Sequence, residues 1–150
     1  MSRDNGPDSS DPQPARSRTA ELVGHALAVA TGYAISLWSV IGGLMGLAAG
    51  VFVGWEILIA SAAYLGYGIC GYILAKEAHL ASAAISWKSS LIWSLIGVVW
   101  LSTLVVMNLH EKTDYTFLSL MTILLSMQLL NLIGWLIANR EEIRPPTKHS

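Results

Sequence analysis

The residue best placed to do chemistry is Glu56, the only Asp, Glu, Lys or Arg between Leu22 and Leu74. A carboxylate at the centre of a bilayer costs about 3 kcal/mol on insertion scales, so acids in membranes tend to line a pathway, pair with another group or stay protonated. Glu56 is therefore our candidate for an ion or proton pathway. The other interpretation is interfacial: if the chain turns near Ala49 and Gly50, the carboxylate lies close to the headgroups and meets water.

The histidines and the single cysteine predict no cofactor. A membrane haem site needs imidazoles paired across facing helices, and of the four histidines only His25 and His79 are expected near one another. We expect His25 to pair locally with Glu21, one helical turn away. Cys70 has no second cysteine for an intramolecular disulfide and is expected to pack. Motifs of zinc proteases, P-loops and serine hydrolases are missing from the sequence, which predicts no metal site and no enzyme.

These residues lie in or beside long uncharged segments of the sequence, which we expect to form membrane-spanning helices. Apolar residues make up 53% of the chain and charged residues 13%, and each segment compares with the roughly 20 residues that cross a bilayer as a helix. The sequence therefore predicts an all-α membrane protein, a four-transmembrane-helix bundle. The expected spans are residues 22–43, 48–75, 87–109 and 115–139. The first two spans form one uninterrupted block, so the chain must turn between Ser39 and Gly50.

The flanking segments differ sharply from this membrane domain, which we assign to residues 21–144. Residues 1–20 mix Pro, Ser, Asp and Arg without apolar periodicity, which predicts a disordered cytoplasmic tail. Residues 145–150 begin with two prolines and are expected to be a flexible C-terminal tail.

Basic residues predict the orientation. Eight of the nine fall on one side of the four predicted spans and only Lys112 on the other. Because basic segments are retained in the cytoplasm, we expect a multi-pass protein of the cell (inner) membrane with both termini cytoplasmic. The formal net charge of −1 gives no indication of a nucleic-acid partner. The eight are Arg3, Arg16, Arg18, Lys76, Lys88, Arg140, Arg144 and Lys148.

Small residues recur at helical spacing on three of the predicted spans. Residues four apart share one helical face, and in lipid such faces let two backbones approach closely. For the stripes of the first two spans, two interpretations stay open with equal weight: they pack these spans together within one subunit, or they join neighbouring subunits. For the stripe of the third span we favour helix packing over the lining of a pore. The stripes are Gly42, Gly46, Gly50 and Gly54; Gly24, Ala28, Gly32 and Ser36; and Ser90, Ser94 and Gly97.

The fourth span carries two polar faces, which predicts two neighbours. Ser119, Thr122 and Ser126 share one face, whereas Gln128 and Asn131 point elsewhere. Such residues more often specify helix packing than line a pore.

Three functions are compatible with these features. The leading hypothesis is a non-enzymatic membrane protein that assembles through its small-residue faces, as a homo-oligomer that could form a pore or as a small subunit of a larger membrane complex. The first alternative is a proton-coupled small transporter that uses Glu56. The second is a regulated, membrane-perturbing or holin-like effector.

Overall fold

The computed structural model describes residues 15–80, 87–111 and 115–140, and these ranges are helical apart from short breaks. Its helices are α1 (Ala15–Val53), α2 (Trp55–Leu80), α3 (Trp87–Glu111) and α4 (Tyr115–Ala138). Each contains a segment long and apolar enough to span a membrane, which confirms the prediction of an all-helical chain with four such helices. The C-terminal tail at 145–150 lies outside the described residues, as does most of the N-terminal tail at 1–20. α1 nevertheless begins inside that N-terminal range, at Ala15.

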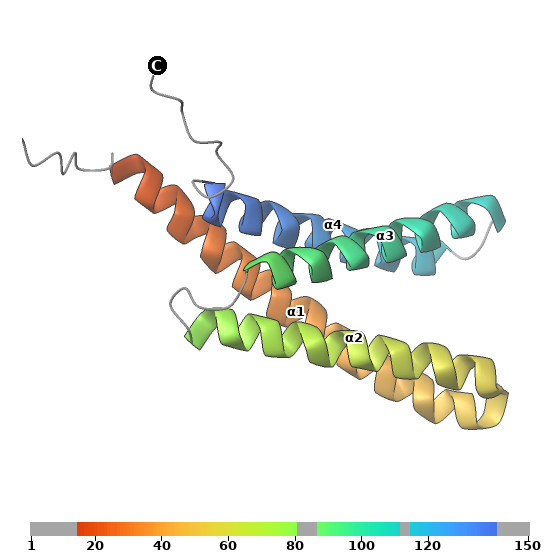
Figure 1. Ribbon diagram of the computed structural model, residues 1–150. Coiled ribbons are helices and arrows are strands. Elements are labelled where there is room, and N and C mark those ends of the chain that lie inside the picture. The colour runs from red at the N-terminus through yellow and green to blue at the C-terminus, as the bar shows by residue number, and fades with distance from the viewer. Residues whose placement is uncertain (1–14, 81–86, 112–114, 141–150) are drawn as a thin grey trace, which may run out of the picture.

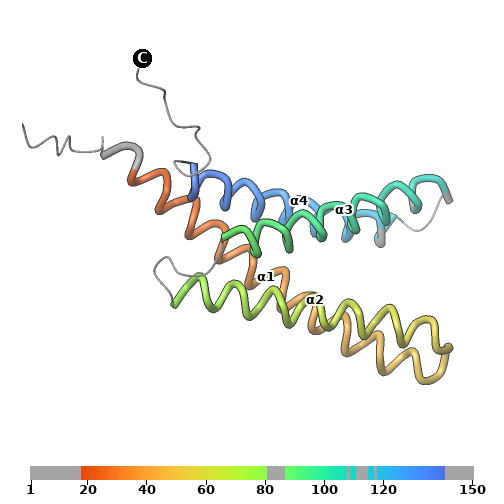
Figure 2. The backbone as a smooth tube through the Cα atoms, in the orientation of Figure 1, coloured from red at the N-terminus to blue at the C-terminus, as the bar shows by residue number. Residues whose placement is uncertain are grey.

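The first two helices reverse direction at Gly54, so the prediction of a turn between Ser39 and Gly50 is wrong. α1 runs unbroken through those positions to Val53, as the backbone trace in Figure 2 shows. Gly54 has a φ of 151°, a conformation that strains any residue with a Cβ. Its N–H still donates to the Gly50 carbonyl at 3.0 Å. The earlier glycines stay helical because nothing there, such as a proline, removes a backbone hydrogen bond.

Two helical hairpins form the molecule, α1–α2 and α3–α4 (Figure 1). α2 packs antiparallel along α1, α4 packs against the N-terminal half of α1, and α3 packs on α4, whereas α2 and α3 touch sparsely. The hairpins cross near the beginning of α1 and diverge toward the end that carries the Gly54 turn. At 1.5 Å per residue the 39 residues of α1 span about 58 Å, longer than a hydrocarbon core of about 30 Å.

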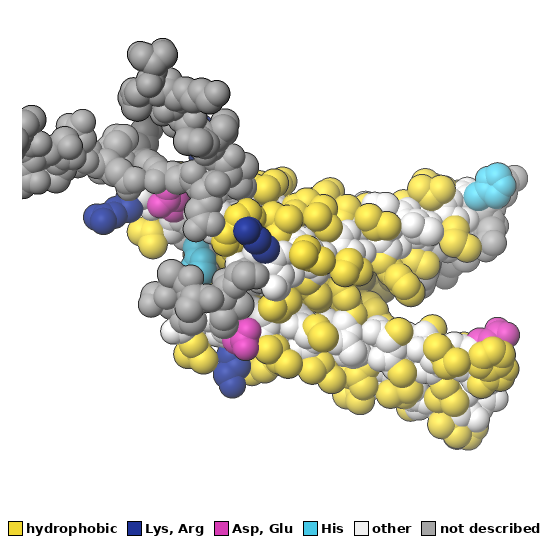
Figure 3. Space-filling view, viewed as in Figure 1, with side chains coloured by type: hydrophobic (Ala, Val, Ile, Leu, Met, Phe, Trp, Pro, Cys, Tyr) yellow, Lys and Arg dark blue, Asp and Glu magenta, His cyan; other side chains and the backbone are white. Residues whose placement is uncertain are grey.

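The interior holds polar side chains beside apolar ones such as Trp93 and Trp135. The largest fully buried side chains are those of Gln128, Asn131, Ser36, Ser39 and Ser94. Large apolar side chains instead cover the outside: Phe52 is 90% exposed, and Figure 3 shows apolar side chains along both hairpins with charged ones at the two ends. Lipid tolerates exposed apolar side chains but cannot satisfy exposed polar groups, so this distribution suits a multi-pass membrane protein.

Candidate functional site: a polar junction with a cavity

The glycines of the predicted stripe contact α2 of the same chain. A Cβ added at Gly42 or Gly50 would lie 2.9 Å from Tyr64 or Leu58, and one at Gly46 would collide with the hydroxyl of Ser61. These three glycines therefore pack against α2 within the α1–α2 hairpin. Gly54 does not share their role, since it forms the turn.

The second small-residue stripe lies on the same helix, α1, and faces other partners. Gly24 and Ala28 contact the backbone around Gly134 of α4, with a Cβ at Gly24 falling 2.9 Å from the Gly134 carbonyl oxygen. Gly32 faces Asn131 and Ala75, while Ser36 faces Gly71 of α2. The two stripes therefore do not face each other across a hairpin, because the turn follows both of them.

Asn131 joins three helices. Its Nδ2 donates to the carbonyl oxygen of Ala28 at 2.5 Å and to the hydroxyl of Thr31 at 3.1 Å, and its Oδ1 accepts from the hydroxyl of Ser94. Asn131 is 1% exposed. These bonds connect α4 to α1 and α3. Ser90 and Gly97, the other members of the predicted stripe on α3, are also buried.

Tyr67 and Trp93 provide a polar connection across the sparse contact between α2 and α3. The Trp93 Nε1 donates to the Tyr67 carbonyl oxygen at 3.0 Å, and the Tyr67 hydroxyl donates to the Trp93 carbonyl oxygen at 3.2 Å. Their rings stack with centroids 4.7 Å apart. The amide Nε2 of Gln128 also donates to the Tyr67 hydroxyl, which brings α4 into the same network.

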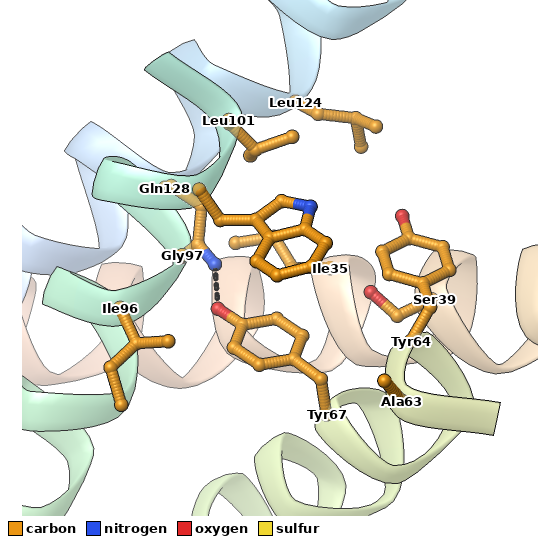
Figure 4. A pocket seen from close by; sticks show the side chains of 11 residues that line it. Ile35, Ser39, Ala63, Tyr64, Tyr67, Ile96, Gly97, Leu101, Leu124 and Gln128 are labelled. Atoms are coloured by element: carbon orange, nitrogen blue, oxygen red, sulfur yellow. Dashed lines mark hydrogen bonds between the residues drawn. The ribbon is translucent and has the colours of Figure 1, made fainter. Parts of the chain in front are cut away.

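A cavity of about 200 Å³ adjoins this network where the two hairpins separate. Figure 4 shows Ser39, Tyr64, Tyr67 and Gln128 around it among apolar side chains. Gln128 is fully buried, yet its Oε1 accepts no hydrogen bond from the described residues. Leaving a buried acceptor unpaired costs about 1–3 kcal/mol. The lining residues are Ile35, Ser39, Ala63, Tyr64, Tyr67, Ile96, Gly97, Trp100, Leu101, Leu124 and Gln128.

A larger apolar cleft of about 520 Å³ continues from the cavity between the diverging hairpins. The two share Tyr64, Trp100 and Leu101. Figure 3 shows the separation of the hairpins at this end of the molecule. The remaining cleft residues are Trp38, Ile41, Gly42, Met45, Ala60, Ser61, Leu104, Leu120 and Met121.

Glu56 lies apart from this junction. It is in the first turn of α2, two residues after Gly54, and it is exposed. This position corresponds to the interfacial interpretation, in which a late turn brings the carboxylate near the headgroups. An acid in the first turn of a helix is also favoured by the helix dipole.

Two expectations about single side chains are wrong. His25 does not pair with Glu21 among the described residues: its Nε2 lies 3.2 Å from the Ala78 carbonyl oxygen, and its ring meets the edge of Trp135. Cys70 is exposed rather than packed. Both errors follow from the course of α2, which brings its C-terminal end against His25 and turns Cys70 outward.

Sequence reasoning identified part of this junction. It singled out Ser94, Gln128 and Asn131 but missed Tyr67, whose phenol bonds to two helices. Trp93, in the middle of an apolar run, was the available signal, since a buried indole N–H requires an acceptor. Comparison with protein-family models, with curated proteins and with solved structures finds no match for this chain.

Proposed function

We propose that this chain is a non-enzymatic membrane protein that assembles into a homo-oligomer through the outward surface of α2. Gly66 carries the proposal. A Cβ added there would meet nothing within 4 Å, whereas Cβ atoms added at the other helical glycines of the described residues would meet neighbouring atoms. A glycine within a helix is less stable than alanine by about 0.5–1 kcal/mol, so one without a neighbour among the described residues is best explained by a partner.

The residues around Gly66 form a surface suited to helix contact. Ala62 and Cys70 lie one turn to either side of Gly66, and all three are exposed. Ile59 and Ile73 flank them, 60% and 47% exposed. We call these five residues the α2 outer face. Small residues between larger ones let a second helix approach closely in lipid, where packing replaces the hydrophobic effect as the attraction between helices.

The charge distribution supports a common orientation for all copies. The basic residues of the described ranges lie at the end where α1 and α3 begin and α2 and α4 end. By the positive-inside rule this end faces the cytoplasm of an inner membrane. In a two-fold dimer of chains inserted the same way, the two α2 helices run parallel. The basic residues are Arg16, Arg18, Lys76, Lys88 and Arg140.

A second membrane protein could occupy the same face in place of a second copy. The transporter hypothesis has less support, because Glu56 lies beside the turn and lines neither the cavity nor the cleft described above. The holin-like hypothesis depends on the same assembly but has no residue that favours it. We therefore place the homo-oligomer first and a heteromeric complex second.

The test is the mass of the purified protein in detergent and in lipid nanodiscs. We expect at least twice the mass of the 16.2 kDa chain for the wild type and the mass of a single chain for Gly66→Leu. Ala30→Leu, at an exposed small residue of α1, is the matched control and should leave the oligomer intact.

Two results would contradict the proposal. The first is a wild type that is monomeric in both nanodiscs and detergent but co-purifies from native membranes with another membrane protein. This result would favour a heteromeric complex over the homo-oligomer. An oligomer that survives Gly66→Leu but dissociates in Ala30→Leu would move the contact to α1.

A further inference from the structure

We propose that the cavity between the hairpins binds an uncharged amphipathic alcohol, with its hydroxyl-bearing head beside Gln128 and its apolar tail in the adjoining cleft. This inference is independent of the proposed assembly, because the cavity is lined by Ala63, Tyr64 and Tyr67 rather than by the α2 outer face.

Three polar groups around the cavity lack partners among the described residues. The Oε1 of fully buried Gln128 is an acceptor without a donor. The hydroxyl of Ser39, which is 1% exposed, and that of Tyr64 make no hydrogen bond within those residues. Figure 4 shows these side chains on separate helices around one space. A ligand hydroxyl can donate to the amide oxygen and accept from a serine or tyrosine hydroxyl, so it can satisfy both kinds of group.

The charge and depth of the site select an uncharged head. The residues given above for the cavity and the cleft include no Asp, Glu, Lys, Arg or His. Ser39, Tyr67, Gly97 and Gln128 each lie near the middle of their helix, so the cavity is at mid-height in the bundle. A charged headgroup is strongly disfavoured at that depth, whereas a hydrophobic alcohol can reach it.

The volumes of the cavity and of the cleft indicate which part of the alcohol each one holds. An engineered apolar cavity of about 150 Å³ holds benzene, so about 200 Å³ accommodates a head slightly larger than one six-membered ring. The cleft of about 520 Å³ shares Tyr64, Trp100 and Leu101 with the cavity and is lined mainly by apolar side chains. An alkyl or isoprenoid tail fits this route toward the lipid.

Photolabelling with matched probes tests the proposal on the full chain in liposomes. The first probe is a long-chain alcohol with a diazirine near its hydroxyl and a terminal alkyne. The second is its methyl ether, which accepts but cannot donate, and the third is the carboxylate of equal length. We expect saturable labelling by the alcohol at least fivefold above that by the ether or the carboxylate, with adducts on buried cavity residues such as Leu101 and Leu124.

Two variants connect the labelling to the cavity. Ala63→Phe places a ring at the cavity wall and should abolish saturable labelling, whereas Ile92→Phe, at an exposed residue outside the cavity lining, should not. Gln128→Leu removes the unpaired acceptor and should reduce the preference for alcohol over ether to less than twofold. Each variant is compared with the wild type by its elution in detergent, so that misfolding is recognised.

Three outcomes would overturn the proposal: equal labelling by alcohol and ether in the wild type, adducts confined to the lipid-facing surface, and alcohol labelling that is unchanged in both Ala63→Phe and Gln128→Leu. If the oligomer were absent but the alcohol preference present, the proposed assembly would fail and this site would stand.

Discussion

Buried polar side chains connect the helices of this protein to one another. Asn131 and Gln128 each bond to other helices and are almost completely buried. In lipid an interhelical hydrogen bond contributes about 0.6 kcal/mol on average and at most about 1.7. Such bonds are individually weak, but a misplaced helix leaves the amide unpaired in hydrocarbon, so they discriminate between packing arrangements.

At this scale we predict that Asn131→Leu lowers the free energy of unfolding by about 1–2 kcal/mol, because it removes the bonds to Ala28, Thr31 and Ser94. Reversible unfolding in mixed SDS micelles measures the change. Ser126→Ala is the control, since its exposed hydroxyl donates to the Thr122 carbonyl of its own helix and, among the described residues, to no other helix. Equal effects of the two substitutions would show that the Asn131 network does not stabilise the fold.

At the scale of elements, glycines decide how closely the helices approach. α1 and α4 meet at Gly24 and Gly134, where an added Cβ would lie 2.8–2.9 Å from backbone atoms of the facing helix. α1 and α2 meet similarly at Gly43, where the contact is with the backbone of Leu65. Backbone atoms cannot rotate away as a side chain can, so a larger residue at these positions forces the helices apart.

Gly134→Leu should therefore destabilise the monomer by at least about 1–3 kcal/mol, the usual cost of overpacking. Gly66→Leu should leave the monomer as stable as the wild type or slightly more stable, because leucine favours helix over glycine. Thermal unfolding in a detergent that keeps both variants monomeric compares them. A lower melting temperature for Gly66→Leu than for Gly134→Leu would contradict the assignment of inward and outward glycines.

At the scale of the whole molecule, the antiparallel order of the helices separates two chemically different ends. The basic residues of the described ranges lie at one end, and Gly54 with Glu56 lies at the other. The cavity and the cleft lie between the hairpins, which diverge toward the Glu56 end. The molecule is thus tightly joined at its basic end and open at the other.

The orientation is tested with single cysteines in a Cys70→Ala background. Phe52→Cys, beside the turn, should react with a membrane-impermeant maleimide in intact cells, because that end is expected outside. Leu80→Cys, at the basic end, should react only after the membrane is permeabilised. Both positions are well exposed, at 90% and 70%. Labelling in the opposite order would place the basic end outside.

The four helices long and apolar enough to span a membrane could be predicted from composition and run length alone, but the turn could not. Gly42, Gly46 and Gly50 are indistinguishable in sequence from Gly54, and uniform hydropathy from Leu22 to Trp55 marks no boundary. Only the position of α2 shows that the first three glycines allow close contact between the helices. The last one instead adopts the φ of 151° that the turn requires. Likewise Tyr67 gave no signal of its own, because Tyr64 and Tyr72 on the same helix have the same side chain.

Cross-linking of native Cys70 in intact membranes tests the central claim, association through the α2 outer face, most directly. In parallel α2 helices that cross at Gly66, the two Cys70 side chains lie one turn from the crossing, and copper–phenanthroline should join them into a disulfide-linked dimer. Gly66→Leu should lose this dimer. The control is the double variant Cys70→Ala, Ile92→Cys, whose single cysteine lies at an exposed position of α3, and it should form no disulfide-linked dimer. A wild type that stays monomeric under these conditions, while the Ile92→Cys control forms a dimer, would contradict association through the α2 outer face.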